Sequence, residues 1–302
     1  MRKGVFYAVG AYLAWGLLPL YWKVFQEMAA WEILAHRIVW SLVFVAVLLF
    51  VTKRWLQMRK AISTAKERGA LLLCSLFISA NWLIFIWAVN NGNVLETSLG
   101  YYINPLLNVL FGVLFLKERL GKGQWMAIAL AAAGVSVMTA HYGRVPWVAI
   151  SLALTFACYG LVKKLIKTDA IISLAWETLV VAPVALGYLV TLHVSGTDTL
   201  SHVTGWQIAL LTLSGVATAL PLFWFAQAAK LLPLSTVGFI QYLAPSISLF
   251  MAVFLFGETF GGVHLVSFGL IWSALFVYTV SSMRKKPGSA QQQVELAIKK
   301  EA

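Results

Sequence analysis

Two stretches of the chain repeat each other at a constant offset. Residues 98–121 read SLGYYINPLLNVLFGVLFLKERLG, and residues 238–261 read GFIQYLAPSISLFMAVFLFGETFG. At an offset of 140 positions, Tyr102 matches Tyr242, Pro105 matches Pro245, Glu118 matches Glu258 and Gly121 matches Gly261. Aliphatic residues coincide easily by chance, whereas matches of Pro, Tyr, Glu and Gly are more specific. The pattern predicts that one apolar helix, with a proline inside it and a glutamate at its end, occurs twice.

The composition predicts that the surface of the protein faces lipid. Of the 302 residues, 61% are hydrophobic and 11% are charged, whereas a soluble domain carries about 25% charged residues. The net charge of +12 does not indicate a nucleic-acid partner, because the basic residues lie between long apolar runs. The two cysteines, Cys74 and Cys158, form no metal-ligand or disulfide pattern. We therefore expect no cofactor and no metal.

The apolar runs predict ten membrane spans, since a bilayer core needs about 20 apolar residues per helix. The first run begins after MRKG and is longer than the apolar part of a signal peptide, so we expect it to be retained. The expected spans cover approximately residues 4–22, 33–52, 70–90, 94–116, 124–141, 146–163, 171–193, 206–229, 234–256 and 263–283. They divide into repeats at 1–142 and 143–283, followed by a tail at 284–302 that we expect to be disordered and cytoplasmic.

The basic residues predict the orientation of these spans. With ten spans, almost every Lys and Arg cluster falls on the side of the N-terminus, for example at residues 2–3, 53–68, 117–122, 163–167 and 284–286. Cytoplasmic loops are enriched in Lys and Arg, so we expect both termini in the cytoplasm. Five spans per repeat is an odd number, so the second repeat enters the membrane upside down. This arrangement is an inverted-topology repeat, which recurs in transporters.

The two prolines inside spans are candidate hinges. Pro105 and Pro245 each leave a backbone carbonyl four residues earlier without its helical donor, at Tyr101 and Gln241. Such a break is tolerated in a membrane where it faces protein or a wet cavity. A hinge, a ligand contact and a plain packing kink all remain open.

Charged residues inside spans are candidate functional groups because they are costly in lipid. For proton or ion coupling the candidates are Glu32, His36, Arg37 and Glu177. Glu177 is the most deeply placed acid, and it is either a proton site or a structural, paired carboxylate. Lys23 is expected to join Glu32 and Arg37 in an ion-paired outer gate. For Glu118 and Glu258, at span ends, we expect interfacial capping or a gate salt bridge.

Amide and aromatic side chains within the spans are the groups that a cavity for a small organic molecule would use. The candidates for substrate binding are Trp15, Asn81, Trp82, Tyr101, Tyr102, Gln241 and Tyr242. For the tryptophans, packing between helices is an equally good interpretation. Small residues in 127–138 and in the last span predict a face for close helix packing or for a homodimer.

Several segments resemble the RarD-type branch of the EamA family in the drug/metabolite transporter superfamily. They are AYLAWGLLPLYWK, EILAHRIVWS, NWLIFIWAVNNGNVLETSLGYYINPLLNVLFGVLFLKERL, YGLVKK and STVGFIQYLAPSISLFMAVFLFGE. The resemblance implies an all-α carrier of the bacterial inner membrane with ten helices, built from two inverted five-helix repeats around a central cavity. Family members of known activity mostly export amino acids and other metabolites, and this branch is commonly labelled a chloramphenicol-resistance permease.

By this resemblance the cavity is lined by spans one to four and six to nine. It would include Trp15, Glu32, Arg37, Asn81, Tyr102, Glu177, Gln241 and Tyr242. A secondary transporter of a small organic solute is therefore the leading hypothesis. A non-transporting membrane scaffold or regulatory subunit is the alternative, and a lipid-substrate enzyme is a weaker one. The sequence contains no Walker loop and no HExxH motif.

Overall fold

The computed structural model describes residues 2–25, 27–91, 94–143, 146–199, 203–255 and 261–284, and no strand occurs among them. The helices are α1 (Arg2–Lys23), α2 (Ala30–Val51), α3 (Trp55–Ala61), α4 (Ala65–Asn90), α5 (Val94–Leu114), α6 (Lys122–Tyr142), α7 (Trp147–Leu165), α8 (Ala170–Val194), α9 (Gly205–Leu231), α10 (Leu234–Gln241), α11 (Leu243–Phe254) and α12 (Gly262–Arg284).

The expected all-α membrane architecture is confirmed. Nine helical segments in the described ranges are long and apolar enough to cross a membrane, with α10 and α11 together forming one of them. A further apolar segment, Leu99–Leu114 in α5, is shorter. Glu96 and Thr97 lie in the first turns of α5 and shorten its apolar run. The prediction of ten full-length spans is therefore matched by nine such segments and this shorter one.

The proline of the second copy coincides with the division between α10 and α11. Pro245 has no N–H to donate to the carbonyl of Gln241, and α10 ends at Gln241. The chain resumes as α11 at Leu243, with Tyr242 in a right-handed helical conformation between them. Pro105 lies inside α5, which runs through it without a break. The two matched prolines thus act differently on their helices.

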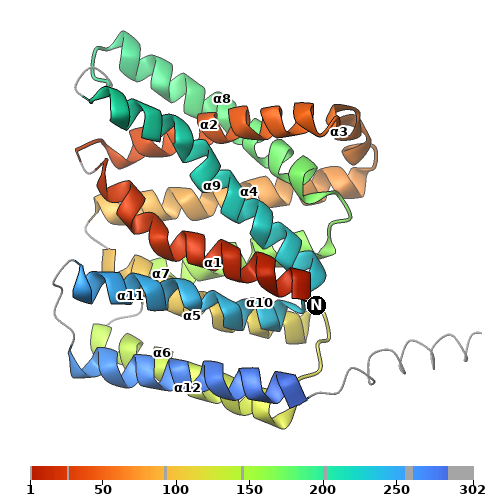
Figure 1. The fold of residues 1–302 in the computed structure, drawn as a ribbon, viewed down its shortest axis with the longest axis vertical. Coiled ribbons are helices and arrows are strands. Elements are labelled where there is room, and N and C mark those ends of the chain that lie inside the picture. The colour runs from red at the N-terminus through yellow and green to blue at the C-terminus, as the bar shows by residue number, and fades with distance from the viewer. Residues whose placement is uncertain are drawn as a thin grey trace, which may run out of the picture.

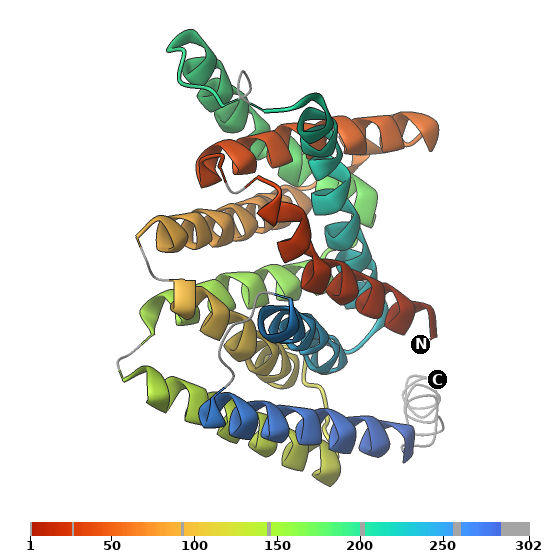
Figure 2. The same cartoon turned by 60° about the vertical axis from the view of Figure 1, so that its left-hand side comes forward.

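The two sequence repeats are intermixed in space. Along the long axis of the molecule, α2 and α8 lie at one end, followed by α4 with α9, α1 with α7, and α5 with α10 and α11 (Figure 1). At the other end α6 and α12 pack along each other, as a second view also shows (Figure 2). Each level therefore contains one element from the first repeat and its counterpart from the second.

Helix packing defines two bundles of mixed origin. The first bundle contains α1, α2, α9 and α10–α11, in which α1 packs on α9 and α11 and α2 packs on α9. The second bundle contains α4, α5, α7 and α8, in which α7 packs on α4 and α5 and α8 packs on α4. Exchanging each helix for its counterpart in the other repeat converts one set of contacts into the other. Two repeats related by a two-fold axis produce this exchange.

Contacts between the bundles run mainly along α2 with α8 and along α5 with α10. A large buried core around Tyr12, Tyr159 and Phe225 joins α1, α7 and α9 between those two lines. A second core, around Tyr102, Tyr242 and Phe268, joins α5 and α10–α11 to α6 and α12.

Gly215 allows α9 to approach α2 at the level of the backbone. A Cβ atom on Gly215 would lie 2.2 Å from the carbonyl carbon and oxygen of Trp40. Ser41 Oγ donates a hydrogen bond of 3.3 Å to the Gly215 carbonyl at the same crossing. Backbone atoms cannot rotate away as side chains can, so this crossing requires glycine.

Gly215→Ala is expected to destabilise the protein, because relief of the clash requires α9 to move away from α2. The cost should be at the upper end of the roughly 1–3 kcal/mol typical of overpacking. Thermal unfolding in detergent should show a clearly lower Tm. Gly187→Ala in α8 is the matched control, since nothing lies within 4 Å of its added Cβ. Equal Tm values for both variants would contradict the packing described here.

Candidate functional site

The basic residues of the connections gather on one side of the molecule, where the spanning helices begin or end. This direction runs along the helices, across the long axis described above (Figure 1). We call this side the basic end: it contains the first residues of α1, the α2–α4 segment, and the α5–α6, α7–α8 and α9–α10 connections. The last residues of α12 also lie there, on the same side as the N-terminus (Figure 1). The opposite end is called the far end.

A carboxylate at the basic end joins the two bundles. Glu118, just beyond α5, accepts hydrogen bonds from the backbone N–H groups of Leu234 at 2.6 Å and Ser235 at 3.0 Å. It also accepts a bond from the Ser235 hydroxyl at 2.5 Å. These N–H groups are the unsatisfied donors of the first turn of α10, where the helix dipole favours negative charge. Glu118 therefore acts as a capping group supplied by the opposite bundle.

Further polar contacts join the bundles at the basic end. Arg54 forms an ion pair with Asp169 at 3.0 Å, and the Trp176 indole N–H donates to the Met58 carbonyl at 3.2 Å. Two lysines donate to backbone carbonyls of the other bundle or its connection, Lys164 to Leu232 and Lys230 to Thr168. The basic end is thus held closed by contacts that cross between the bundles.

An amide cluster extends this junction into the interior. Asn108 donates to Gln241 Oε1 at 2.7 Å and to Asn104 Oδ1 at 3.0 Å, while Gln241 donates to Asn104 Oδ1 at 2.5 Å. All three side chains are buried. Asn104 also donates to the Ala153 carbonyl at 2.8 Å, which anchors α5 to α7. The cluster lies where α5 meets α10, beside the prolines of both repeats.

Several polar contacts toward the far end lie within one bundle. In the second bundle, Asn81 of α4 donates to the Leu152 carbonyl and to Thr155 of α7, at 2.8 and 3.0 Å. In the first bundle, Tyr21 donates to the carbonyl of Leu210, and Gln207 donates to that of Val24. These bonds hold each bundle together at this end, while Glu32 of α2 binds Thr199 in the connection that follows α8.

Arg37 lies in this region and is a half-buried residue. Its Nε donates to Thr218 Oγ1 at 3.1 Å, and its guanidinium carbon lies 4.4 Å from the ring centroid of Trp22. Tyr21 and Tyr101 lie close enough to interact electrostatically with it. Tyr101 belongs to the second bundle and is 52% exposed. The group therefore brings a cation and aromatic rings together between the bundles.

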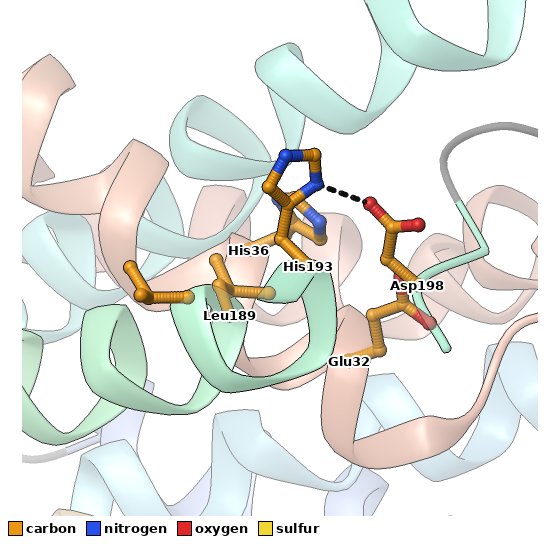
Figure 3. Close-up of a pocket in the computed structure, with 6 residues that line it drawn as sticks. Glu32, His36, Leu189, His193 and Asp198 are labelled. Carbon is orange, nitrogen blue, oxygen red and sulfur yellow. Dashed lines mark hydrogen bonds and ion pairs between the residues drawn. The ribbon is translucent and has the colours of Figure 1, made fainter. Parts of the chain in front are cut away.

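A small cavity of about 250 Å³ lies between α2 and α8 at the far end. Figure 3 shows its polar residues, with His193 directed at Asp198 and with Glu32 and His36 on the neighbouring helix. The Nδ1 atom of His193 lies 2.9 Å from Asp198 Oδ2. His36 is buried, and its Nε2 has no hydrogen-bond partner in the described structure.

Glu177 forms a buried ion pair with Lys163. It accepts hydrogen bonds from Tyr159 at 2.9 Å and from Ser173 at 2.7 Å, and Lys163 donates to Ser173 at 2.7 Å. Lys163 is 0% exposed and Glu177 is 3% exposed. Lys163 therefore supplies the counter-charge of Glu177 within the core.

The structure separates the predicted substrate-binding residues into groups. Trp15 packs with Phe156 and Phe225 in the central core, and Trp82 packs against the same core. Tyr102 and Tyr242 are buried in the core next to α12, away from Arg37. The remaining three lie at the sites described above: Asn81, Tyr101 and Gln241.

The expected outer gate has a different geometry. Glu32 accepts bonds from the backbone N–H of Thr199 at 2.9 Å and from its hydroxyl. In the ranges that the structure describes, Glu32 and Arg37 form no ion pair. Lys23 ends α1 at the far end. Glu258 lies outside the described residues.

Sequence reasoning missed the roles of Lys163, Trp22 and Thr218. Lys163 was assigned to a basic loop cluster, although it follows Tyr159 by one helical turn and so shares its buried face. Trp22 precedes Lys23 at the end of a span, a position that is typical of tryptophans at the membrane interface. Thr218 is an isolated hydroxyl in an apolar helix, and only the crossing of α9 with α2 places it beside Arg37.

The chain is similar to known proteins over almost its whole length. The model of the EamA-like transporter family matches it twice, over residues 2–140 and 145–280. The "Uncharacterized transporter YojE" of Bacillus subtilis is 46% identical over 95% of this chain and 97% of its own length. "Protein RarD" of Escherichia coli is 40% identical, over 93% and 95%. A solved crystal structure, 16% identical, matches 94% of this chain and 99% of its own with a TM-score of 0.72, which supports the fold alone.

Lys163→Met is expected to lower stability strongly, because it leaves the Glu177 carboxylate buried without its counter-charge. Removal of one partner of a buried pair costs about 3–5 kcal/mol. The double variant Lys163→Met/Glu177→Met should recover most of this loss, since both charges are removed. Thermal unfolding in detergent tests this, with the exposed Lys167→Met as control. A single variant as stable as the double one would contradict the pairing.

Proposed function

Because the chain belongs to the EamA-like transporter family, in its RarD-type branch, we propose that it is a secondary transporter of a small organic solute. It would work by alternating access, with the solute bound between the first and second bundles. The protein would act as a carrier rather than as an enzyme or a scaffold. The family relationship supports a transporter, and the solute and mechanism are the proposal.

The distribution of hydrogen bonds carries this proposal. Among the described residues, several bonds at the basic end run from one bundle to the other or to its connection. At the far end, Glu32 of α2 binds Thr199 in the α8–α9 connection, while the bonds of Asn81 and Gln207 stay within a bundle. One of the two states of an alternating-access carrier has this character: one end is sealed, and the other is free to part. The opposite state would form when the basic-end contacts break and the far ends approach each other.

The moving units would be the mixed bundles rather than the sequence repeats. The lines of contact between α2 and α8 and between α5 and α10 flank the interior on both sides. Rotation about an axis that lies in the membrane plane and passes through these two contacts would open one end while closing the other. The division of α10 from α11 at Tyr242 lies next to the amide cluster, so the chain could bend there during the movement.

The charge pattern sets the orientation in this proposal. The basic end would face the cytoplasm of a bacterial cell, since Lys and Arg are enriched in cytoplasmic loops. Both termini would then be cytoplasmic, and the protein would lie in the inner membrane. The conformation described here would be open toward the outside.

Cross-linking across the basic end should stop transport. Cys74 and Cys158 are replaced by alanine, and Glu118→Cys/Ser235→Cys are joined by a short, reducible bis-methanethiosulfonate reagent. The protein is placed in liposomes loaded with mixed metabolites, and solute loss is followed by mass spectrometry. We expect flux to fall to the level of empty liposomes and to return on reduction, because the bundles can no longer part at this end.

Glu67→Cys/Thr168→Cys is the matched control, because this pair lies within the second bundle. The Thr168 hydroxyl donates to Glu67 at 2.6 Å, so the same reagent can reach both positions. Its cross-link should leave most of the flux intact. Full flux through the cross-linked 118–235 pair would rule out opening at the basic end.

A further inference from the structure

Arg37 has unused binding capacity. A guanidinium carries five N–H donors, and the structure accounts for one of them, the Nε–H bound to Thr218. Its guanidinium carbon lies 4.4 Å from the centroid of the Trp22 ring, and no bond from either Nη atom is found in the described ranges. No carboxylate lies within ion-pair distance of Arg37 in the described ranges.

The acids that could neutralise Arg37 from within the spans are engaged elsewhere. Glu32 is held by Thr199, Glu177 by Lys163, and Glu96 accepts the backbone N–H of Val148 at 3.0 Å. A cation at membrane depth without a counter-charge is costly. Arg37 is therefore a site at which an external anion would gain a charge-assisted contact without displacing a protein carboxylate.

The surroundings of Arg37 indicate what kind of anion fits. Trp22 and Tyr21 come from the first bundle, while Tyr101 comes from the second and is 52% exposed. Phe85 lies 6.4 Å from the Tyr101 ring and extends this aromatic surface. Aromatic rings beside a planar guanidinium suit a ligand that combines a carboxylate with a flat apolar body.

We propose that Arg37 and the aromatic residues Trp22 and Tyr101 form a recognition site for small aromatic monocarboxylates. This inference rests on the proposed function and names the substrate class of that site. The carboxylate would take a bidentate contact with the two Nη atoms of Arg37, with Thr218 fixing the orientation of the guanidinium. The aromatic body would lie against the rings, so a bound anion would contact both bundles.

The lack of an ion pair to Arg37 in the described ranges has a consequence for selectivity. No carboxylate in the described ranges lies within ion-pair distance of Arg37. Glu32, which lies on the same helix, is bound by Thr199 and is therefore less available to hold a ligand ammonium group. Amines should therefore bind poorly, and neutral amides should lose the charge-assisted contact. Discrimination between a carboxylate and its amide is the property that separates this site from a merely apolar one.

Equilibrium binding to the purified full-length protein tests the proposal. The probes are benzoate, phenylacetate, 3-phenylpropanoate and indole-3-acetate, each with its primary amide, together with phenethylamine and inorganic phosphate, measured by titration calorimetry. At least one acid should bind, with its amide at least about tenfold weaker. Arg37→Gln should weaken the acid on the order of tenfold to hundredfold, the range of a lost charged hydrogen bond.

Three further variants test whether the Arg37 guanidinium itself binds the acid. Arg59→Gln, at an exposed position on α3, is the matched control and should bind like the wild type. Thr218→Val keeps the charge but removes the partner of Nε, so it should weaken the acid by less than Arg37→Gln does. Arg37→Lys should fall between the wild type and Arg37→Gln, and it serves as the test if Arg37→Gln does not fold.

Several results would overturn the proposal. They are no binding by any of the acids, equal binding of acids and amides, unchanged affinity in Arg37→Gln, or competition by phosphate as strong as by the acids. Flux in liposomes distinguishes failure of the transporter proposal from failure of the Arg37 site. Binding of an acid without flux would contradict the transporter and leave this site standing, whereas flux of a neutral or cationic solute without acid binding would do the reverse.

Discussion

The bond between Glu118 and the first turn of α10 is the constraint on which the arrangement depends. A helix that begins inside a membrane protein exposes N–H donors that lipid cannot satisfy. Glu118 satisfies two of them from the opposite bundle. The position of α10, and with it the amide cluster around Gln241, is therefore tied to the end of α5. Closure of the basic end and positioning of the interior polar residues are two results of one contact.

Intermixing of the repeats follows from how little each could bury alone. The strongest packing partners of α1 are α9 and α11, and those of α7 are α4 and α5. In each case the partners belong to the other repeat. Each bundle obtains its core only when both repeats are present. A movement of one bundle against the other consequently involves both repeats equally. If each helix adopted the contacts of its counterpart in the other repeat, the basic end would open and the far end would close.

The sequence predicted the helices well because apolar runs and charged loops are local properties. Pro105 and Pro245 were equal candidates for a break, and the helix divides near Pro245 but runs through Pro105. The charge pattern placed the connections of the described chain at two opposite ends. The capping interpretation of Glu118 also agrees with its contacts. The division of the family match at residues 140 and 145 lies near the predicted boundary at 142, which stays a prediction.

The site was less predictable because its residues meet only through helix crossings. Tyr101 and Tyr102 are adjacent in sequence, yet one lies near Arg37 and the other packs against Phe268. One step along a helix turns a side chain by about 100°, and hydropathy does not say which face meets which neighbour. Lys163 was hidden for the same reason, since a basic residue at a span end ordinarily reaches the interface rather than the core.

The coupling of the two ends can be measured without knowing the solute. Spin labels at Lys23 and Trp147 report the far-end separation of the bundles, labels at Lys3 and Leu165 report the basic end, and labels at Lys23 and Trp206 report one bundle alone. Distances in lipid nanodiscs would be compared between the wild type and Glu118→Ala. The account predicts a longer basic-end distance, a shorter far-end distance and an unchanged distance within the bundle. If both inter-bundle distances stay unchanged or lengthen together, the bundles do not move as coupled rigid units and the account is wrong.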